Sequence, residues 1–315
     1  MANTILLALA PIFFVLALGY GAGRLRMVDN QQVDSLNALV MNFALPASLF
    51  AATASAPRSQ LFAQAPLFLI LGAVMLVLFL AWYFLQVRLG KGGKAEASLQ
   101  GLTIAFPNLA GVGLPILADV LGPSGTVPLA VALASGSIIV SPLSLIIVEL
   151  SRKQDGAAEA PTARMLGSLR RALTKPVVLA PALGILFSLC GFKSGAVAEA
   201  CLMLIGHSAP GVALFLTGLI LSAQPFRLDW KVVSATWIAD IIRPLLTAAV
   251  VFLLPVSTET GKVAILLAAM PSGFFGILFA VNYRLDSATM GSMVAASTVL
   301  SIVTMAIAIA VLFPH

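Results

Sequence analysis

Hydrophobic runs long enough to cross a bilayer recur along the chain, and they constrain its fold more than any other feature. A membrane-spanning helix needs about 20 apolar residues. Runs of that length lie at 3–23, 33–53, 65–87, 97–118, 127–150, 176–192, 198–222, 231–254, 262–282 and 288–312. The mean hydropathy is +1.05 and only 10% of residues are charged, against about 25% in a soluble domain. The sequence therefore predicts an all-α integral membrane protein with ten transmembrane helices in a lipid bilayer.

The fourth run contains a segment, FPNLAGVGLP at 106–115, that should not continue as a regular helix. Pro107 lacks a backbone N–H and clashes with the carbonyl of Thr103. Gly111 and Gly113 loosen the turn that follows. A broken helix at membrane depth persists only where protein packs around it or where it lines a wet cavity, so the break indicates a site. The alternative is that the proline only kinks a continuous helix, which membrane spans tolerate.

A second break, MPSGFFG at 270–276, lies in a matching position of the second half of the chain. Pro271 follows Pro107 by 164 positions, and Pro210 follows Pro46 by the same offset. Two coincidences at one offset indicate an internal repeat, and five helices per copy turn the second copy upside down. We expect a first repeat at 1–150, a cytoplasmic linker at 151–175 and an inverted repeat at 176–315. Paired interrupted helices of this kind indicate a transporter with a binding site near the bilayer midplane.

Basic residues are distributed unequally between the two sets of loops. The loops after odd-numbered helices carry 14 of the 18, and the opposite loops carry 3. The larger set is Arg24, Arg26, Arg88, Lys91, Lys94, Arg152, Lys153, Arg164, Arg170, Arg171, Lys175, Arg227, Lys231 and Arg284; the smaller set is Arg58, Lys193 and Lys262. The positive-inside rule makes the larger set cytoplasmic and places both termini outside. This asymmetry accounts for the pI of 9.7 without a nucleic-acid partner.

The two breaks offer a way to bind an anion without a free cation. Unpaired N–H groups and the positive dipole end begin each half-helix. Asn108 and Ser272 directly follow the two prolines, and both side chains can donate hydrogen bonds to a carboxylate. The expected substrate-binding residues are Pro107, Asn108, Gly111, Pro271, Ser272 and Gly273.

Four further polar residues in the spans are candidates for support or coupling. Asp240 and Arg243 lie three positions apart, which predicts one helix face and mutual neutralisation. They either couple transport to a proton or only lock the helix in its bundle. His207 either relays protons or bonds a backbone carbonyl, and Asn42 either lines a path or makes a packing hydrogen bond.

Enzyme interpretations find little support in the sequence. It lacks the H-E-x-x-H, G-x-S-x-G and phosphate-loop motifs. Two cysteines and two histidines form no metal-ligand spacing, so neither metal nor cofactor is expected. An ion channel would need a repeated filter or pore ring, and none appears. Gly19 and Gly23 form a GxxxG pattern that suits either a dimer contact or packing within the chain.

These motifs resemble those of the auxin efflux carrier family, in its bacterial, malonate-carrier-like branch. The resemblance rests on APIFFVLALGY at 10–20, FALP at 43–46, FPN at 106–108, GLP at 113–115 and PSG at 271–273, in that order and spacing. It covers essentially the whole chain. It implies broken, crossing fourth and ninth helices in two inverted five-helix repeats, in a bacterial inner membrane. It also implies a scaffold of helices 1, 2, 6 and 7 that often forms a homodimer, and an elevator unit of the other six.

The resemblance carries the family's crossover asparagine onto Asn108 and its prolines onto Pro107 and Pro271. One departure is that plant members have a charged supporting pair on helix 3, whereas here that helix is uncharged and the pair lies on helix 8. We therefore expect a secondary active transporter of small organic anions, malonate-like carboxylates among them, with a proton as a candidate coupling ion. The alternatives are a sodium-coupled symporter of the bile-acid type and a membrane receptor that binds its ligand without moving it.

Overall fold

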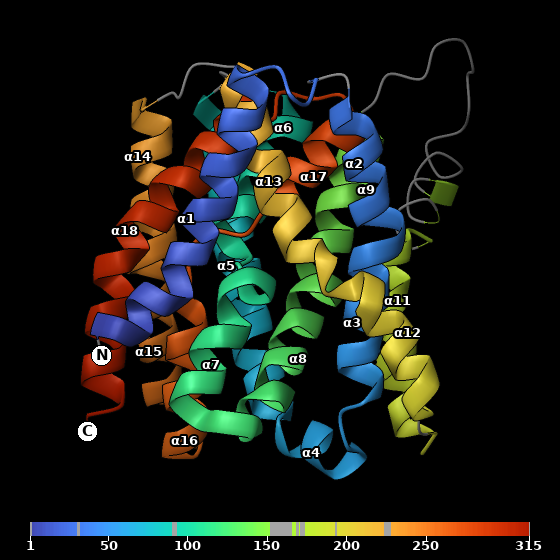
Figure 1. Ribbon diagram of the computed structural model, residues 1–315. Helices are drawn as coiled ribbons and strands as arrows, with labels where there is room; N and C mark the ends of the chain where they lie inside the picture. The colour runs from blue at the N-terminus through green and yellow to red at the C-terminus, as the bar shows by residue number, and fades with distance from the viewer. Residues whose placement is uncertain are drawn as a thin grey trace.

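A computed structural model describes residues 2–29, 32–89, 93–151, 166–167, 170, 174–192, 194–223 and 228–314. Regular structure in these ranges is helical, apart from one isolated β-bridge. The helices form one elongated bundle, with α14, α15 and α18 along one side and α11 and α12 along the other (Figure 1). Most of the linker expected at 151–175 lies outside the described residues.

The first half of the chain contains helices α1 to α9. Their bounds are α1 (Ala2–Arg24), α2 (Val33–Leu39), α3 (Leu45–Ala54), α4 (Arg58–Ala63), α5 (Ala65–Leu89), α6 (Lys94–Ala105), α7 (Leu114–Leu121), α8 (Thr126–Ser135) and α9 (Ser141–Ser151). π-Helical turns at Val40–Ala44, Leu109–Gly113 and Gly136–Val140 precede α3, α7 and α9, and a 3-10 turn at Gly122–Gly125 precedes α8.

The second half of the chain contains helices α11 to α18. Their bounds are α11 (Pro176–Leu189), α12 (Ala196–Gly206), α13 (Ser208–Ala223), α14 (Trp230–Trp237), α15 (Arg243–Leu253), α16 (Thr258–Ala268), α17 (Phe275–Asn282) and α18 (Ala288–Leu312), with a π-helical turn at Ile238–Ile242 before α15. In Figure 1 the N-terminal end of α1 and the C-terminal end of α18 lie on the same side of the molecule.

Six continuous helical stretches in the described residues are long and apolar enough to cross a membrane. They are Val33–Ala54, Ala65–Leu89, Val127–Ser151, Ala196–Ala223, Trp230–Leu253 and Ala288–Leu312. The all-α, multi-pass membrane architecture expected from hydropathy is thereby confirmed. Helices α6, α7, α16 and α17 are each too short to span a bilayer of about 30 Å alone, because a helix rises only about 1.5 Å per residue.

Each π-helical turn ends two residues before a proline, namely Pro46, Pro115, Pro142 or Pro244. In a regular helix the carbonyl of each residue accepts a hydrogen bond from the N–H four residues later. A proline has no such N–H, and its ring crowds that carbonyl. A π turn widens the helix locally, so that a carbonyl finds its donor five residues on. In the first turn, for example, the N–H of Leu45 donates to the carbonyl of Val40. The helices therefore continue past these prolines.

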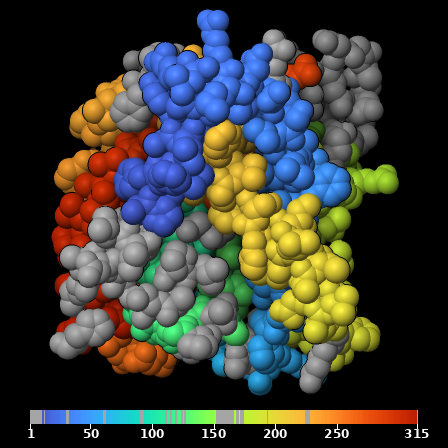
Figure 2. All heavy atoms as spheres, in the orientation of Figure 1, coloured from blue at the N-terminus to red at the C-terminus, as the bar shows by residue number. Residues whose placement is uncertain are grey.

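Helices α1 and α13 pack closely along one face of the molecule, where Figure 2 shows them side by side. Glycines permit this approach, because a Cβ at Gly19 would collide with the carbonyl of Phe215 and a Cβ at Gly23 with the side chain of Ser222. The GxxxG pattern of α1 therefore serves packing within the chain.

Candidate functional site

The two interruptions at Pro107 and Pro271 meet in the middle of the molecule. Helix α6 ends at Ala105 because Phe106, with φ −94° and ψ 107°, takes the extended conformation favoured before proline. Pro107 and Ser272 form an isolated antiparallel bridge. The chain therefore breaks at both prolines, and the alternative of kinked but continuous helices does not describe either.

Backbone groups freed by the breaks are satisfied across the bridge. Asn108 N–H donates to the carbonyl of Pro271 over 2.7 Å, and Gly273 N–H donates to the carbonyl of Phe106 over 2.9 Å. Ser272 N–H donates to Ser297 Oγ over 2.8 Å. We expected these amides to be open to an anion, and the structure corrects that expectation for this conformation. The physical reason is burial, because an N–H group enclosed by protein needs a protein acceptor.

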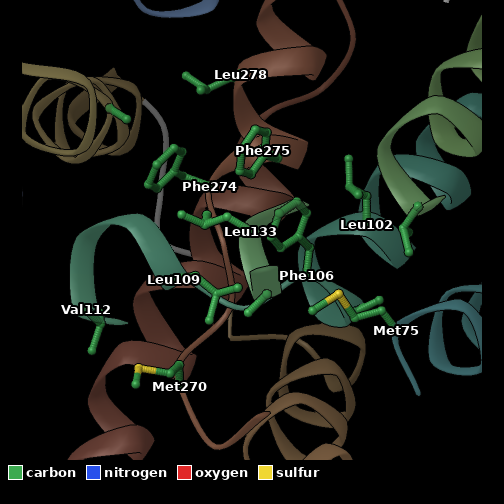
Figure 3. Close-up of a cluster of buried hydrophobic side chains, with 14 of the residues drawn as sticks. Met75, Leu102, Phe106, Leu109, Val112, Leu133, Met270, Phe274, Phe275 and Leu278 are labelled. Atoms are coloured by element: carbon green, nitrogen blue, oxygen red, sulfur yellow. The ribbon is translucent and has the colours of Figure 1, made fainter. Parts of the chain in front are cut away.

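The side chains of Asn108 and Ser272 lie at the bridge but are buried, at 2% and 1% exposure. Aromatic rings cover the bridge on one side: the Phe106 and Phe275 rings stack with centroids 4.7 Å apart, and Phe274 lies 5.6 Å from Phe275. Figure 3 shows this cluster with Leu133 of α8 among the rings. The bridge is therefore enclosed in this conformation.

Two glycines allow the elements around the bridge to approach. A Cβ at Gly136 would lie 2.7 Å from the ring of Phe106, and a Cβ at Gly276 would collide with Thr103 Oγ1. Helix α17 therefore lies directly against α6, and the ring of Phe106 lies over the π turn between α8 and α9. Gly111, named from sequence, belongs to the π turn Leu109–Gly113 that follows the first break.

Arg243 ties the ends of the two interrupted helices together. It is 1% exposed, and its Nε donates to the carbonyl of Ala268 over 2.8 Å. Its two terminal nitrogens donate to the carbonyls of Ile104 and Met270. These carbonyls lie in the last turn of α6, at the last residue of α16 and just beyond it, where helical partners are missing and the dipole is negative. The guanidinium thus satisfies both helix ends at once.

Asp240 connects to the bridge by another route. Ser297 Oγ donates to Asp240 Oδ1 over 2.7 Å, and the same hydroxyl accepts from Ser272 N–H. Asp240 is 1% exposed, and its Oδ2 has no hydrogen-bond partner. The spacing of Asp240 and Arg243 predicted mutual neutralisation, and their charges do act on each other through space. The guanidinium hydrogen bonds found in the described residues go to the three backbone carbonyls.

A cavity of about 530 Å³ lies between α3, α8 and the α12–α13 pair. Its polar lining is Ser48, Ser55, Glu199 and the exposed His207, which separates α12 from α13. Ser55 Oγ donates to Glu199 Oε1 over 3.2 Å, joining α3 to α12. His207, predicted as a relay or packing residue, therefore faces this cavity.

Helix α8 separates the cavity from the bridge. Leu129 and Leu133 line the cavity. Leu133 also lies among the aromatic rings in Figure 3. Leu129 packs against Gly113, where an added Cβ would lie 2.6 Å from the Leu129 side chain. Asn108 and Ser272 do not line this cavity. Only one layer of α8 side chains separates the two.

Asn42 is not brought to the bridge. It is exposed and lines a surface groove of about 470 Å³ shared with α11 and α12. Asn37 in α2, by contrast, is buried, and its Nδ2 donates to the carbonyl of Leu278 in α17 over 2.9 Å. Sequence reasoning missed Asn37 and Ser297, since neither carries a local signal: α18 contains several small hydroxyl residues. In the described residues, no cluster of three His, Cys, Asp or Glu side chains could hold a metal ion.

Comparison with known proteins gives a consistent family assignment. The family described as "Membrane transport protein" matches residues 4–309. The chain is 30% identical over 298 residues to "Uncharacterized transporter YfdV" of Escherichia coli K12, covering 94% of each chain. It is 26% identical over 222 residues to a Rhizobium meliloti protein named "Putative malonate transporter", covering 69% of this chain and 67% of that one. "Auxin efflux carrier component 8" of Arabidopsis thaliana is 23% identical, with 88% and 89% covered.

Proposed function

Because the chain belongs to the membrane transport protein family, we propose that it is a secondary active carrier of small organic anions, with malonate-like carboxylates as its substrate class. The family assignment makes the protein a membrane transporter and not an enzyme. The carboxylate class is suggested by the name of the Rhizobium meliloti relative and by the hydrogen-bond donors of Asn108 and Ser272 at the bridge.

The bridge between the two breaks carries the proposal. Its pairs are Pro107 with Ser272 and Asn108 with Pro271, and an offset of 164 converts one pair into the other. Arg243 contacts the carbonyls of Ile104 and Ala268, which differ by the same 164 positions. These relations support two inverted five-helix repeats at 1–150 and 176–315, with ten spans and the axis of symmetry at the bridge.

An elevator-type movement suits the position of the cavity. The cavity lies between α3 and α12–α13, which belong to the proposed scaffold, and α8, which belongs to the proposed moving unit with the bridge. Sliding of that unit along the scaffold would carry Asn108 and Ser272 past the layer formed by Leu129 and Leu133. In this proposal both termini lie outside a bacterial inner membrane and the 151–175 linker lies in the cytoplasm, which the distribution of basic residues between the loops supports. A homodimer through the scaffold is part of the proposal.

The guanidinium of Arg243 already donates its hydrogen bonds to backbone carbonyls, and this favours reversible binding of an anion. A free guanidinium forms strong bidentate pairs with carboxylates. Here its nitrogens donate to three backbone carbonyls, so the anion is left with neutral donors such as the Asn108 amide. Moderate affinity follows, and a carrier needs to release its substrate.

Thermal stabilisation of the purified protein by malonate and related carboxylates, followed by flux into proteoliposomes, tests the proposal. Asn108→Ala should lower the affinity for the anion, obtained from the thermal stabilisation, at least tenfold. The melting temperature measured without anion should stay nearly unchanged. Asn42→Ala is the matched control, because Asn42 faces the outer groove, and it should bind normally. Equal affinity in the wild type and Asn108→Ala would remove Asn108 from the site. Anion binding without flux would identify a receptor, and flux driven only by a sodium gradient would identify a sodium symporter.

A further inference from the structure

We propose that Asp240 is the proton-binding site of this carrier, and that Ser297 transmits its protonation state to the anion site at Ser272. The inference rests on the proposed function and specifies its coupling ion. It is carried by the chain of contacts from Asp240 through Ser297 to the backbone of Ser272.

The surroundings of Asp240 define where a proton would add. One carboxylate oxygen accepts from Ser297, whereas Oδ2 is buried without a partner. Around this turn pack Trp82, Ile104 and Met293, which form an apolar cluster with residues of α14 and its π turn. A proton can join Oδ2 without displacing an existing hydrogen bond. Protonation there removes the charge of Asp240 from the site.

Arg243 is the charged group that acts on Asp240 through space. Other elements packed around this turn offer no nearer charge: α18 contains no titratable residue, and those of α5, α6 and α16 lie at other levels of these helices. They are Tyr83, Arg88, Lys94, Glu96, Glu259 and Lys262. With Asp240 ionised, its charge offsets that of Arg243. With Asp240 protonated, the positive charge of Arg243 remains uncompensated next to both breaks, which favours an anion there.

Ser297 adds a directional effect to this electrostatic one. A hydroxyl has one hydrogen and two lone pairs. While Asp240 is ionised, the hydrogen is held by a charge-assisted bond and a lone pair accepts from Ser272 N–H. When Asp240 is neutral, that bond weakens and the hydroxyl is free to turn towards an incoming carboxylate. Proton and anion therefore favour each other's binding, which is the condition for symport, and the coupling is reciprocal.

The test measures anion affinity against pH in the wild type and in Asp240→Asn, which is neutral at every pH and nearly isosteric. In the wild type, the apparent Kd should rise by about tenfold per pH unit once Asp240 ionises, as expected for one linked proton. Asp240→Asn should bind with the low-pH affinity at all pH values. In proteoliposomes it should retain anion exchange but lose accumulation driven by a pH gradient.

Ser297→Ala isolates the transmitting hydroxyl. We expect it to reduce the pH dependence of anion affinity, while Ser297→Thr, which keeps the hydroxyl, restores it. Ser301→Ala is the matched control, because the Ser301 hydroxyl bonds only the carbonyl of Thr298 in its own helix. A structural role alone would lower the melting temperature of Ser297→Ala without changing the pH profile.

The infrared band of the protonated Asp240 carboxyl group, recorded as a function of pH in the absence of any anion, gives a readout that does not depend on transport. The band should be present in the wild type and missing in Asp240→Asn. Wild type and Asp240→Asn with the same pH dependence of binding would overturn the inference while leaving the carrier function intact. A wild type that binds no organic anion at any pH would overturn the proposed function and the coupling together.

Discussion

Replacing Arg243 with lysine should strongly destabilise the protein, although the charge is kept. The guanidinium donates to three carbonyls that belong to two different helix ends. A hydrogen bond to a charged group contributes about 1.5–3 kcal/mol, and a buried acceptor left unsatisfied costs about 1–3 kcal/mol. A lysine ammonium is a single point and can reach the end of one helix but not both. We therefore expect Arg243→Lys to lose about 2–5 kcal/mol, a large fraction of a total stability of about 5–15 kcal/mol.

The assay is thermal unfolding of the detergent-solubilised protein, followed by circular dichroism. The expected loss corresponds to a decrease in melting temperature of about 3–8 °C, because the entropy of unfolding is about 0.7 kcal/mol/K for a chain of 315 residues. Arg24→Lys is the matched control: Arg24 is exposed, and its Nε donates to Tyr20 Oη over 3.2 Å. Exposed interactions of that kind contribute about 0–1 kcal/mol, so the control should unfold like the wild type. If Arg243→Lys is as stable as the control, the guanidinium does not hold the two helix ends together.

Two further predictions concern packing around the bridge. Gly276→Ala should lower stability by about 3 kcal/mol or more, because its Cβ would collide with Thr103 Oγ1, whereas Gly21→Ala, in open space, should have little effect in the same unfolding assay. Equal stability of the two variants would show that α17 and α6 separate easily. Tyr283→Phe removes the hydrogen bond of 2.7 Å from the tyrosine hydroxyl to the buried Glu149 Oε1. It should lower the free energy of unfolding by about 1–3 kcal/mol in the same assay. An unchanged melting temperature would show that this contact adds no net stability.

The fold follows from the sequence where its causes are local. Apolar length predicts the membrane helices, and the chemistry of proline predicts that the helices break at Pro107 and Pro271. Small residues on α1 predict a close helix contact, although the choice of α13 as partner is not contained in the pattern itself. The π turns before Pro46, Pro115, Pro142 and Pro244 were not predicted, because a proline in the sequence indicates a lost hydrogen bond and not the wider turn that precedes it.

The two breaks were predictable from the sequence, but their hydrogen bonds were not. The amides of Asn108 and Gly273 pair across two segments that lie far apart in the chain, the amide of Ser272 pairs with Ser297, and no local pattern encodes such pairing. Ser297 contacts Asp240 because one face of α18 meets the turn that holds Asp240. Such contacts depend on how the helices are rotated against one another, and the residue spacing within one helix does not specify that rotation.

The contacts of Arg243 also have a consequence for biosynthesis. When the span Trp230–Leu253 enters the membrane, Ile104 is the one carbonyl partner of Arg243 that precedes it in the chain. Ala268 and Met270 follow 25 and 27 residues later. An unpaired arginine at the centre of a span costs about 2.5–3.5 kcal/mol on insertion scales. We therefore expect the first half of the chain to receive this charge before α16 enters the membrane, and the contacts of Arg243 to be complete only after the ninth hydrophobic run has been inserted.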